Sequence, residues 1–156
     1  MPEATQLIEA SVKIDATPQT VWSVVSDLRR MGEWSPQCVK MFIRGDEVGV
    51  GTRTINLNRK GALAWPTTAK VVRFDKDRAI AWRVTENHTV WSYEITPDGD
   101  GVQLTERREA PGGQVTAVSA TLTKWLLGGR EDFEVELREG MAESLKRIKQ
   151  AAEAAS

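Results

Sequence analysis

Glu106 and Arg108 are the residues of this sequence whose types and spacing could most readily do chemistry. They lie two positions apart in a segment of alternating apolar and polar residues, which predicts a β-strand with both side chains on one face. A lone charge on an apolar face costs several kcal/mol unless it is paired. The two residues are therefore expected to form a structural ion pair or to orient the polar end of a ligand. A third alternative is that Glu106 transfers a proton as an acid or base.

Tyr93 is the second residue that could transfer a proton. A hairpin closed by residues 98–101 places Tyr93 opposite Glu106, and a turn near residues 86–88 adds a third strand beside it. We take the shared face of these strands as the candidate ligand-binding surface, which comprises Ile80, Trp82, Trp91, Tyr93, Ile95, Leu104, Glu106 and Arg108. Its aromatic side chains either pack beneath a helix or form a platform for an apolar or ring-containing ligand. No catalytic motif surrounds Glu106 or Tyr93, so catalytic residues are not assigned.

Two further segments remain open. The strand predicted at residues 51–58 turns either Ile55 and Leu57 or Thr54 and Asn56 toward the core, and its pattern fits both alternatives. Residues 110–129 combine flexible glycines at both ends with apolar residues between them. This segment is either a fixed cover for the core or a gate over a cavity, and Leu122, Trp125 and Leu126 are its candidate ligand contacts.

Several other chemistries find no support in the sequence. With one histidine and one cysteine, the chain cannot assemble a metal site from soft ligands. The segment Gly49-Val50-Gly51 lacks the third glycine of a dinucleotide fingerprint, and there is no P-loop or nucleophile elbow. We therefore expect no metal and no cofactor.

Composition narrows the class of protein. The chain has 156 residues, of which 40% are hydrophobic, so we expect one domain with a sizeable core. A balance of 21 basic against 22 acidic residues argues against a nucleic-acid partner. Basic residues occur in no run longer than a pair, and no apolar stretch could span a bilayer, so we expect no polybasic membrane patch and no stable membrane insertion.

The expected compartment is the cytoplasm. The N-terminal residues lack the charged and apolar regions of a secretion signal. Cys38 has no second cysteine with which to form a disulfide, which fits a reducing environment. The sequence predicts no particular oligomeric state.

The chain shows four successive patterns of secondary structure. Residues 7–14 alternate as a half-buried strand, and Thr17-Pro18 then caps a short helix that leads to a helical region ending near Gly32 and Pro36. From residue 38 to 109, short alternating segments joined by short turns predict an antiparallel meander. After residue 130 one apolar stripe predicts a helix of about 24 residues. The stripe consists of Phe133, Leu137, Met141, Leu145, Ile148 and Ala152.

Five short segments in this order carry a family resemblance. They are residues 14–22, 26–28, 34–36, 49–53 and 91–101, with the sequences IDATPQTVW, SDL, WSP, GVGTR and WSYEITPDGDG. Together they resemble the START-like (SRPBCC) superfamily, in particular its bacterial polyketide cyclase/dehydrase and lipid-transport branch. The resemblance implies an α+β helix-grip fold like that of the birch pollen allergen. In that fold a curved antiparallel β-sheet wraps around a long C-terminal α-helix, with two short helices after the first strand.

The resemblance also implies that residues 1–156 form a single START-like ligand-binding domain with a hydrophobic cavity. Our leading hypothesis is binding of a small hydrophobic molecule such as a lipid, a fatty acid or a polyketide-like ring system, for transport or sequestration. The first alternative is a polyketide cyclase, aromatase or dehydrase that acts on a poly-β-carbonyl chain. The second is a partner-binding module with a filled core. Whether the chain is an enzyme is left open.

Overall fold

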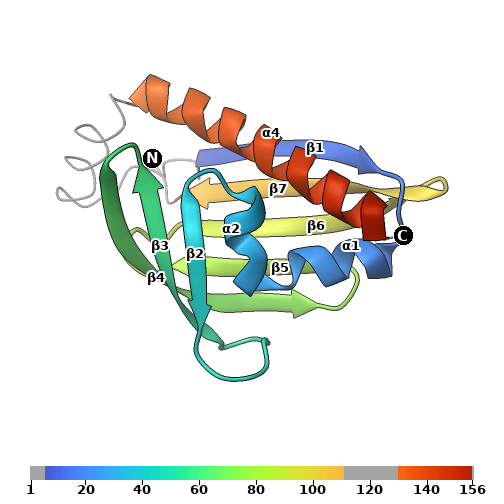
Figure 1. The fold of residues 1–156 in the computed structure, drawn as a ribbon, viewed down its shortest axis with the longest axis horizontal. Helices are drawn as coiled ribbons and strands as arrows, with labels where there is room; N and C mark the ends of the chain where they lie inside the picture. The colour runs from blue at the N-terminus through green and yellow to red at the C-terminus, as the bar shows by residue number, and fades with distance from the viewer. Residues whose placement is uncertain (1–5, 111–129, 156) are drawn as a thin grey trace, which may run out of the picture.

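The computed structural model describes residues 6–110 and 130–155, and its centre is one seven-stranded antiparallel sheet (Figure 1). The strands are β1 (Gln6–Ile14), β2 (Cys38–Ile43), β3 (Arg53–Lys60), β4 (Leu63–Asp75), β5 (Ala79–Val84), β6 (Val90–Asp98) and β7 (Gly101–Ala110). Their order across the sheet is β1-β7-β6-β5-β4-β3-β2. Short turns join β3 through β7 as a meander, whereas β1 pairs with β7 at the far edge.

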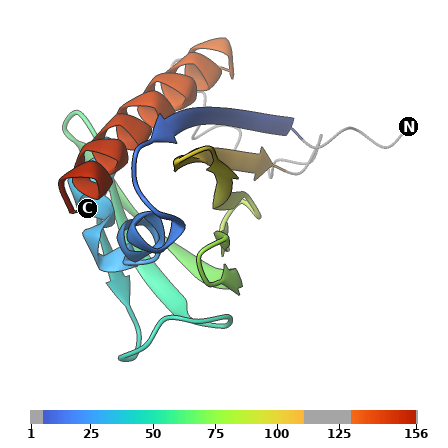
Figure 2. The same ribbon diagram turned by 90° about the vertical axis from the view of Figure 1, so that its right-hand side faces the viewer.

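The long helix α4 (Arg130–Ala155) lies across this sheet and packs against β1 and against the short helices. Figure 2 shows that the sheet is strongly curved, with the helices on its concave side. The predicted apolar stripe is the buried side of α4, with Leu137, Met141, Leu145, Ile148 and Ala152 all buried. The side chain of Phe133 lies outside the described residues. This arrangement is the helix-grip fold, as predicted.

The short helices after β1 begin where the sequence predicts. In α1 (Pro18–Val25) the Thr17 hydroxyl accepts a hydrogen bond from the Thr20 amide, and proline occupies the first position. A 3₁₀ turn, η1 (Leu28–Arg30), leads to α2 (Met31–Trp34). The helical region ends at Trp34, between Gly32 and Pro36, as predicted, and Gly32 lies inside α2. A Cβ atom at this position would lie 1.9 Å from the Val39 carbonyl oxygen, so glycine permits the close approach of α2 to β2.

The predicted pairing of the central strands is confirmed at every position. Tyr93 lies opposite Glu106, and Trp91 lies opposite Arg108. On the other side of β6, Trp82 pairs with Trp91 and Ile80 pairs with Tyr93. The alternation of side chains therefore brings the predicted candidate surface to the concave face of the sheet.

The structure also resolves the ambiguous strand. Thr54 and Asn56 point inward and are 3% and 4% exposed, whereas the Ile55 side chain is 56% exposed. The Thr54 hydroxyl donates to the Asn56 side-chain oxygen at 2.8 Å, and Asn56 Nδ2 donates to the Thr67 hydroxyl at 3.2 Å. Because these polar atoms are hydrogen-bonded, their burial costs little free energy.

Two further expectations concern a membrane-spanning helix and the predicted gate. Within residues 6–110 and 130–155, no helix is both long enough and apolar enough to cross a bilayer. The predicted gate, with Leu122, Trp125 and Leu126, lies outside the described residues.

Candidate ligand-binding site

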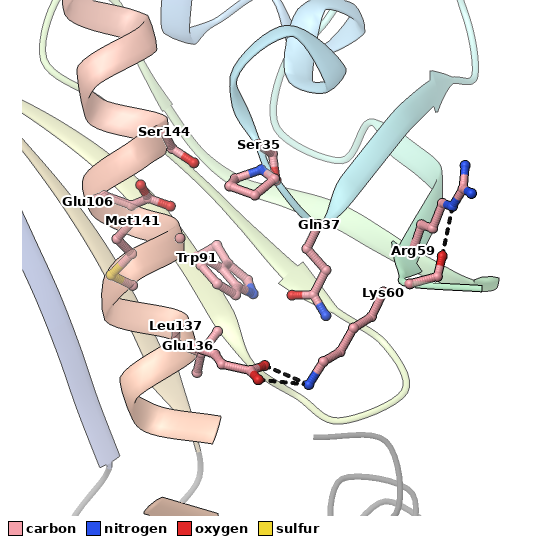
Figure 3. Close-up of a pocket in the computed structure, with 13 residues that line it drawn as sticks. Ser35, Gln37, Arg59, Lys60, Trp91, Glu106, Glu136, Leu137, Met141 and Ser144 are labelled. Carbon is pink, nitrogen blue, oxygen red and sulfur yellow. Dashed lines mark hydrogen bonds and ion pairs between the residues drawn. The ribbon is translucent and has the colours of Figure 1, made fainter. Parts of the chain in front are cut away.

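A cavity of about 310 Å³ lies between α4, the β3–β4 hairpin and the concave face of the sheet (Figure 3). Its size is at the lower end of the range of about 300 to 1,000 Å³ that is typical of small-molecule sites. Four parts of the chain contribute to its wall: the α2–β2 connection, the hairpin, the sheet and α4. The lining residues are Ser35, Pro36, Gln37, Arg59, Lys60, Gly61, Trp91, Glu106, Glu136, Leu137, Gly140, Met141 and Ser144.

Glu106 is the acidic residue at the sheet side of this cavity. Its side chain is 5% exposed, and Figure 3 shows its carboxyl group near Ser144 on α4. Within the described residues, its Oε1 atom has no hydrogen-bond partner. A buried carboxyl oxygen without a partner is costly, so a ligand that supplies one would be favoured at this position.

The other interaction of Glu106 is with Tyr93, which lies opposite it on β6. The Tyr93 hydroxyl donates a hydrogen bond to the carboxyl group, which lowers the pKa of Glu106, but the larger effect of burial raises that pKa to about 8. Burial, together with the nearby Glu106 carboxylate, also raises the pKa of Tyr93 well above its ordinary value. At neutral pH both groups are therefore mainly protonated and can donate hydrogen bonds.

Arg108 occupies a different environment from Glu106. The ion pairs among the described residues include none between these two side chains. Instead, the Arg108 guanidinium lies 6.0 Å from the centre of the Trp91 ring, and burial lowers its pKa to about 10. A cation over an aromatic face is a stabilising arrangement, and here it also fixes one side of a cavity wall.

The rest of the wall combines apolar residues with the polar residues Ser35, Gln37 and Ser144, and its rim is charged. Leu137 and Met141 project from α4 opposite Trp91, and a Cβ atom at Gly140 would meet nothing within 4 Å. At the rim, Lys60 on the hairpin forms an ion pair with Glu136 on α4, with an Nζ–Oε2 distance of 2.7 Å (Figure 3). This ion pair connects the tip of the hairpin to the helix.

The predicted surface residues divide into two groups. Trp91 and Glu106 line the cavity, and Tyr93 lies directly behind Glu106. The others do not line it: Ile80, Trp82, Ile95 and Leu104 are buried in the core beneath the helices, and the buried Arg108 lies beside the Trp91 ring. The Trp82 and Tyr93 rings lie 5.8 Å apart within this core. Contact of these residues with a ligand stays a prediction.

Sequence reasoning missed the wall formed by the hairpin and by α4. In the sequence, Lys60-Gly61 indicates only a turn, and the hairpin residues Arg59, Lys60 and Gly61 lie far in sequence from the residues of the other three parts of the wall. On α4 a signal was present, because Gly140 and Ser144 interrupt the apolar stripe at positions next to Leu137 and Met141. Small or polar residues inside such a stripe leave space beside it.

The fold and the cavity define a helix-grip protein, and the comparisons with known proteins agree. The model of the family described as polyketide cyclase / dehydrase and lipid transport matches residues 5–153, so the chain belongs to this family. No curated protein sequence matches it significantly.

Similar solved structures share the fold over nearly the whole chain. A polyketide-cyclase-like protein from Corynebacterium glutamicum has 28% sequence identity and a TM-score of 0.62, with 99% of this chain and 95% of that chain covered. The Zhui aromatase/cyclase from Streptomyces sp. R1128 has 18% identity and a TM-score of 0.74, with 96% and 94% covered. Ara h 8.0201 has 9% identity and a TM-score of 0.69, with 97% and 99% covered.

Proposed function

We propose that this protein binds a small hydrophobic molecule that carries a carbonyl or hydroxyl group, with that group hydrogen-bonded to Glu106. The observation that supports this most directly is the partnerless Oε1 atom of a buried carboxyl group in the cavity wall. Trp91, Leu137 and Met141 supply apolar surface for the body of the ligand. Apolar surface combined with a few polar groups that fix the orientation of a ligand is the usual anatomy of a ligand site.

The protonation of Glu106 limits the kind of polar group that fits. With a pKa of about 8, the side chain is mainly neutral at pH 7 and donates a hydrogen bond, so a carbonyl oxygen is a suitable acceptor. A ligand carboxylate at the same place would be buried next to an acid and would raise the pKa of Glu106 further. We therefore favour a neutral oxygen at the inner end of the ligand.

Two matched naphthalenes test this proposal. 2-Acetylnaphthalene carries a carbonyl, whereas 2-isopropylnaphthalene has a similar shape without it. Titration followed by tryptophan fluorescence at about pH 6 should give saturable binding of both, with the ketone several-fold tighter. Glu106→Leu should abolish that preference, and raising the pH of the wild-type protein above about 8 should weaken it. Absence of saturable binding would refute the proposal, and equal affinities would refute the role of Glu106.

Catalysis is the second candidate function, and the raised pKa of Glu106 is what favours it. An acid whose pKa lies near neutrality can both give and accept a proton during the cyclisation or dehydration of a poly-β-carbonyl chain. Burial raises the pKa of the Cys38 thiol to about 11, which makes this cysteine a poor nucleophile.

Glu106→Gln separates binding from catalysis. The amide keeps the shape and a hydrogen-bond donor but cannot transfer a proton. If the protein is a cyclase, the variant should bind 2-acetylnaphthalene normally while losing its conversion of a synthetic poly-β-ketone thioester to aromatic product by at least about a hundredfold. If the wild-type protein gives no product above the uncatalysed reaction, the binding function stands alone.

A further inference from the structure

We propose that the outward surface of β2–β5 docks this protein onto an anionic lipid bilayer. We define this surface, the basic face, by three exposed apolar residues and five exposed basic residues on the convex side of these strands. They are Phe42, Ile55, Leu57, Lys40, Arg53, Arg59, Lys70 and Arg83.

The sheet brings together basic residues that are dispersed in the sequence. Arg53 on β3 pairs with Lys70 on β4, and Lys70 pairs with Arg83 on β5. Three cations therefore stand side by side in one row across three strands. Directly opposed like charges destabilise a sheet, so this row costs stability in the isolated protein. An anionic partner would remove that cost.

The basic face differs in its charge pairing from the other half of the same convex surface. On the β1–β7–β6 half, Arg107 forms ion pairs with Glu9 at 2.7 Å and with Glu94 at 3.0 Å. None of the ion pairs within residues 6–110 and 130–155 involves any of the five cations of the basic face. Glu86 also reaches this face and offsets part of its positive charge; its two carboxylate oxygens accept hydrogen bonds from Thr68. The positive charge is thus local, on a chain whose net charge is -1.

Apolar side chains lie in the middle of these charges. Phe42 and Ile55 are directly paired on neighbouring strands and are 49% and 56% exposed. Leu57 follows on the same face of β3, and the Lys40 ammonium lies 5.0 Å from the centre of the Phe42 ring. Aromatic and aliphatic side chains surrounded by basic residues are what an anionic membrane interface accommodates, because lipid headgroups meet the cations while the acyl boundary receives the apolar groups.

This combination favours a bilayer over other partners. A second copy of the chain would oppose two sets of five cations, which repel each other. The phosphates of a nucleic acid would meet the cations but offer no apolar surface to Ile55 and Leu57. The β1–β7–β6 half of the convex surface carries glutamates, so an anionic bilayer would repel this half. The protein would therefore bind with β2–β4 toward the lipid.

The orientation also connects the basic face to the cavity. Arg59 belongs to this face by its alternation with Arg53 and Leu57 along β3, and it also lines the cavity. Docking through β2–β4 would therefore place the rim at Lys60 and Gly61 close to the headgroups. A molecule of low solubility in water could then pass between membrane and cavity.

Vesicle sedimentation tests the docking without any cavity ligand. Wild-type protein should bind vesicles that contain equal amounts of phosphatidylcholine and phosphatidylglycerol. It should bind vesicles of pure phosphatidylcholine only weakly. Each cation contributes about fivefold to such binding, so Arg53→Glu/Lys70→Glu should weaken it by tenfold or more, and high salt should do the same. Ile55→Ser should weaken it several-fold. The matched control Lys76→Glu/Lys146→Glu makes the same change of net charge at exposed positions away from this face, and it should bind like the wild-type protein.

Three outcomes would overturn the proposal: no binding to the anionic vesicles, equal losses in the control variant, or binding only to an acidic protein or a nucleic acid offered in competition. Arg53→Gln/Lys70→Gln provides a second variant if the reversed one does not fold, and thermal unfolding checks both. The naphthalene titration is independent of this assay, so a failure of docking leaves the proposed binding function intact.

Discussion

Tyr93 lies directly opposite Glu106 on neighbouring strands, and its hydroxyl donates a hydrogen bond to the buried carboxyl group. The Oε1 atom of this carboxyl group has no hydrogen-bond partner among the described residues. This carboxyl group is the origin of both the proposed binding and the proposed proton transfer.

The pKa of Glu106 predicts how stability depends on pH. The carboxyl titrates near 4.5 when it is unperturbed and near 8 in the folded protein, so between these values the folded state holds a proton that the unfolded state has lost. Stability should therefore fall as the pH rises from about 4.5 to about 8, by roughly 4 kcal/mol in total. Urea unfolding at several pH values measures this.

Glu106→Gln removes that titration. The variant should match the wild-type protein at about pH 5 and be more stable than it at about pH 9, because it buries no carboxylate. Glu139→Gln on the exposed side of α4 is the matched control and should retain the wild-type slope. A wild-type slope in Glu106→Gln would show that another group carries the pH dependence.

Gly140 offers a way to fill the cavity without disturbing the core. A Cβ atom there would meet nothing within 4 Å, so Gly140→Phe should project its ring into the cavity from α4. Binding of 2-acetylnaphthalene should fall by at least about tenfold while the protein remains folded.

Gly140→Ala is the control for the change of backbone. It should stabilise the helix by about 0.5–1 kcal/mol and leave most of the space available, so its binding should stay near the wild-type value. Fluorescence titration and thermal unfolding of the two variants give both quantities. Unchanged binding in Gly140→Phe would place the ligand elsewhere.

The ion pair between Lys60 and Glu136 should control the opening of the cavity more than the stability of the fold. Both side chains are partly exposed, so Lys60→Glu should cost no more than about 1 kcal/mol. Repulsion between the hairpin and α4 should nevertheless speed ligand release several-fold, measured by stopped-flow fluorescence. The charge swap Lys60→Glu/Glu136→Lys should restore slow release; if it does not, the ion pair does not hold the rim closed.

The strand pairing shows how far sequence reasoning reaches. Alternation and turn position together predict which residues face one another, and Trp82 with Trp91 and Tyr93 with Glu106 are found as predicted. The same alternation could not decide the strand at residues 51–58. There the hydrogen bonds that Thr54 and Asn56 make inside the sheet outweigh the exposure of Ile55, and they depend on Thr67 of the next strand.

The sequence predicts which residues share the concave face, but it does not predict which of them line the cavity. Residues on one face of a sheet share a direction, but whether they line a space depends on how closely the opposite layer packs. Ile80 and Leu104 are completely buried in the core, whereas Trp91 and Glu106 lie where Gly140 on α4 leaves room. The raised pKa of Glu106 likewise depends on burial, which the sequence alone does not give.

Gly32 provides the last test, because the structure shows that it allows a close approach of two elements. The helical region ends at Trp34, between Gly32 and Pro36, as predicted, and Gly32 itself lies inside α2 with the Val39 carbonyl oxygen 1.9 Å from the position of a Cβ atom. Since the obstacle is backbone, Gly32→Ala must push α2 away from β2, at a cost of about 2 kcal/mol or more, despite the better helix propensity of alanine.

Gly49→Ala, where a Cβ atom meets nothing within 4 Å, should change stability by less than about 0.5 kcal/mol. Urea unfolding of the two variants compares them directly, and equal small effects would mean that α2 does not need this close approach. Because Trp34 at the end of α2 is followed at once by Ser35 and Pro36 of the cavity wall, Gly32→Ala should also weaken ligand binding, whereas Gly49→Ala should not.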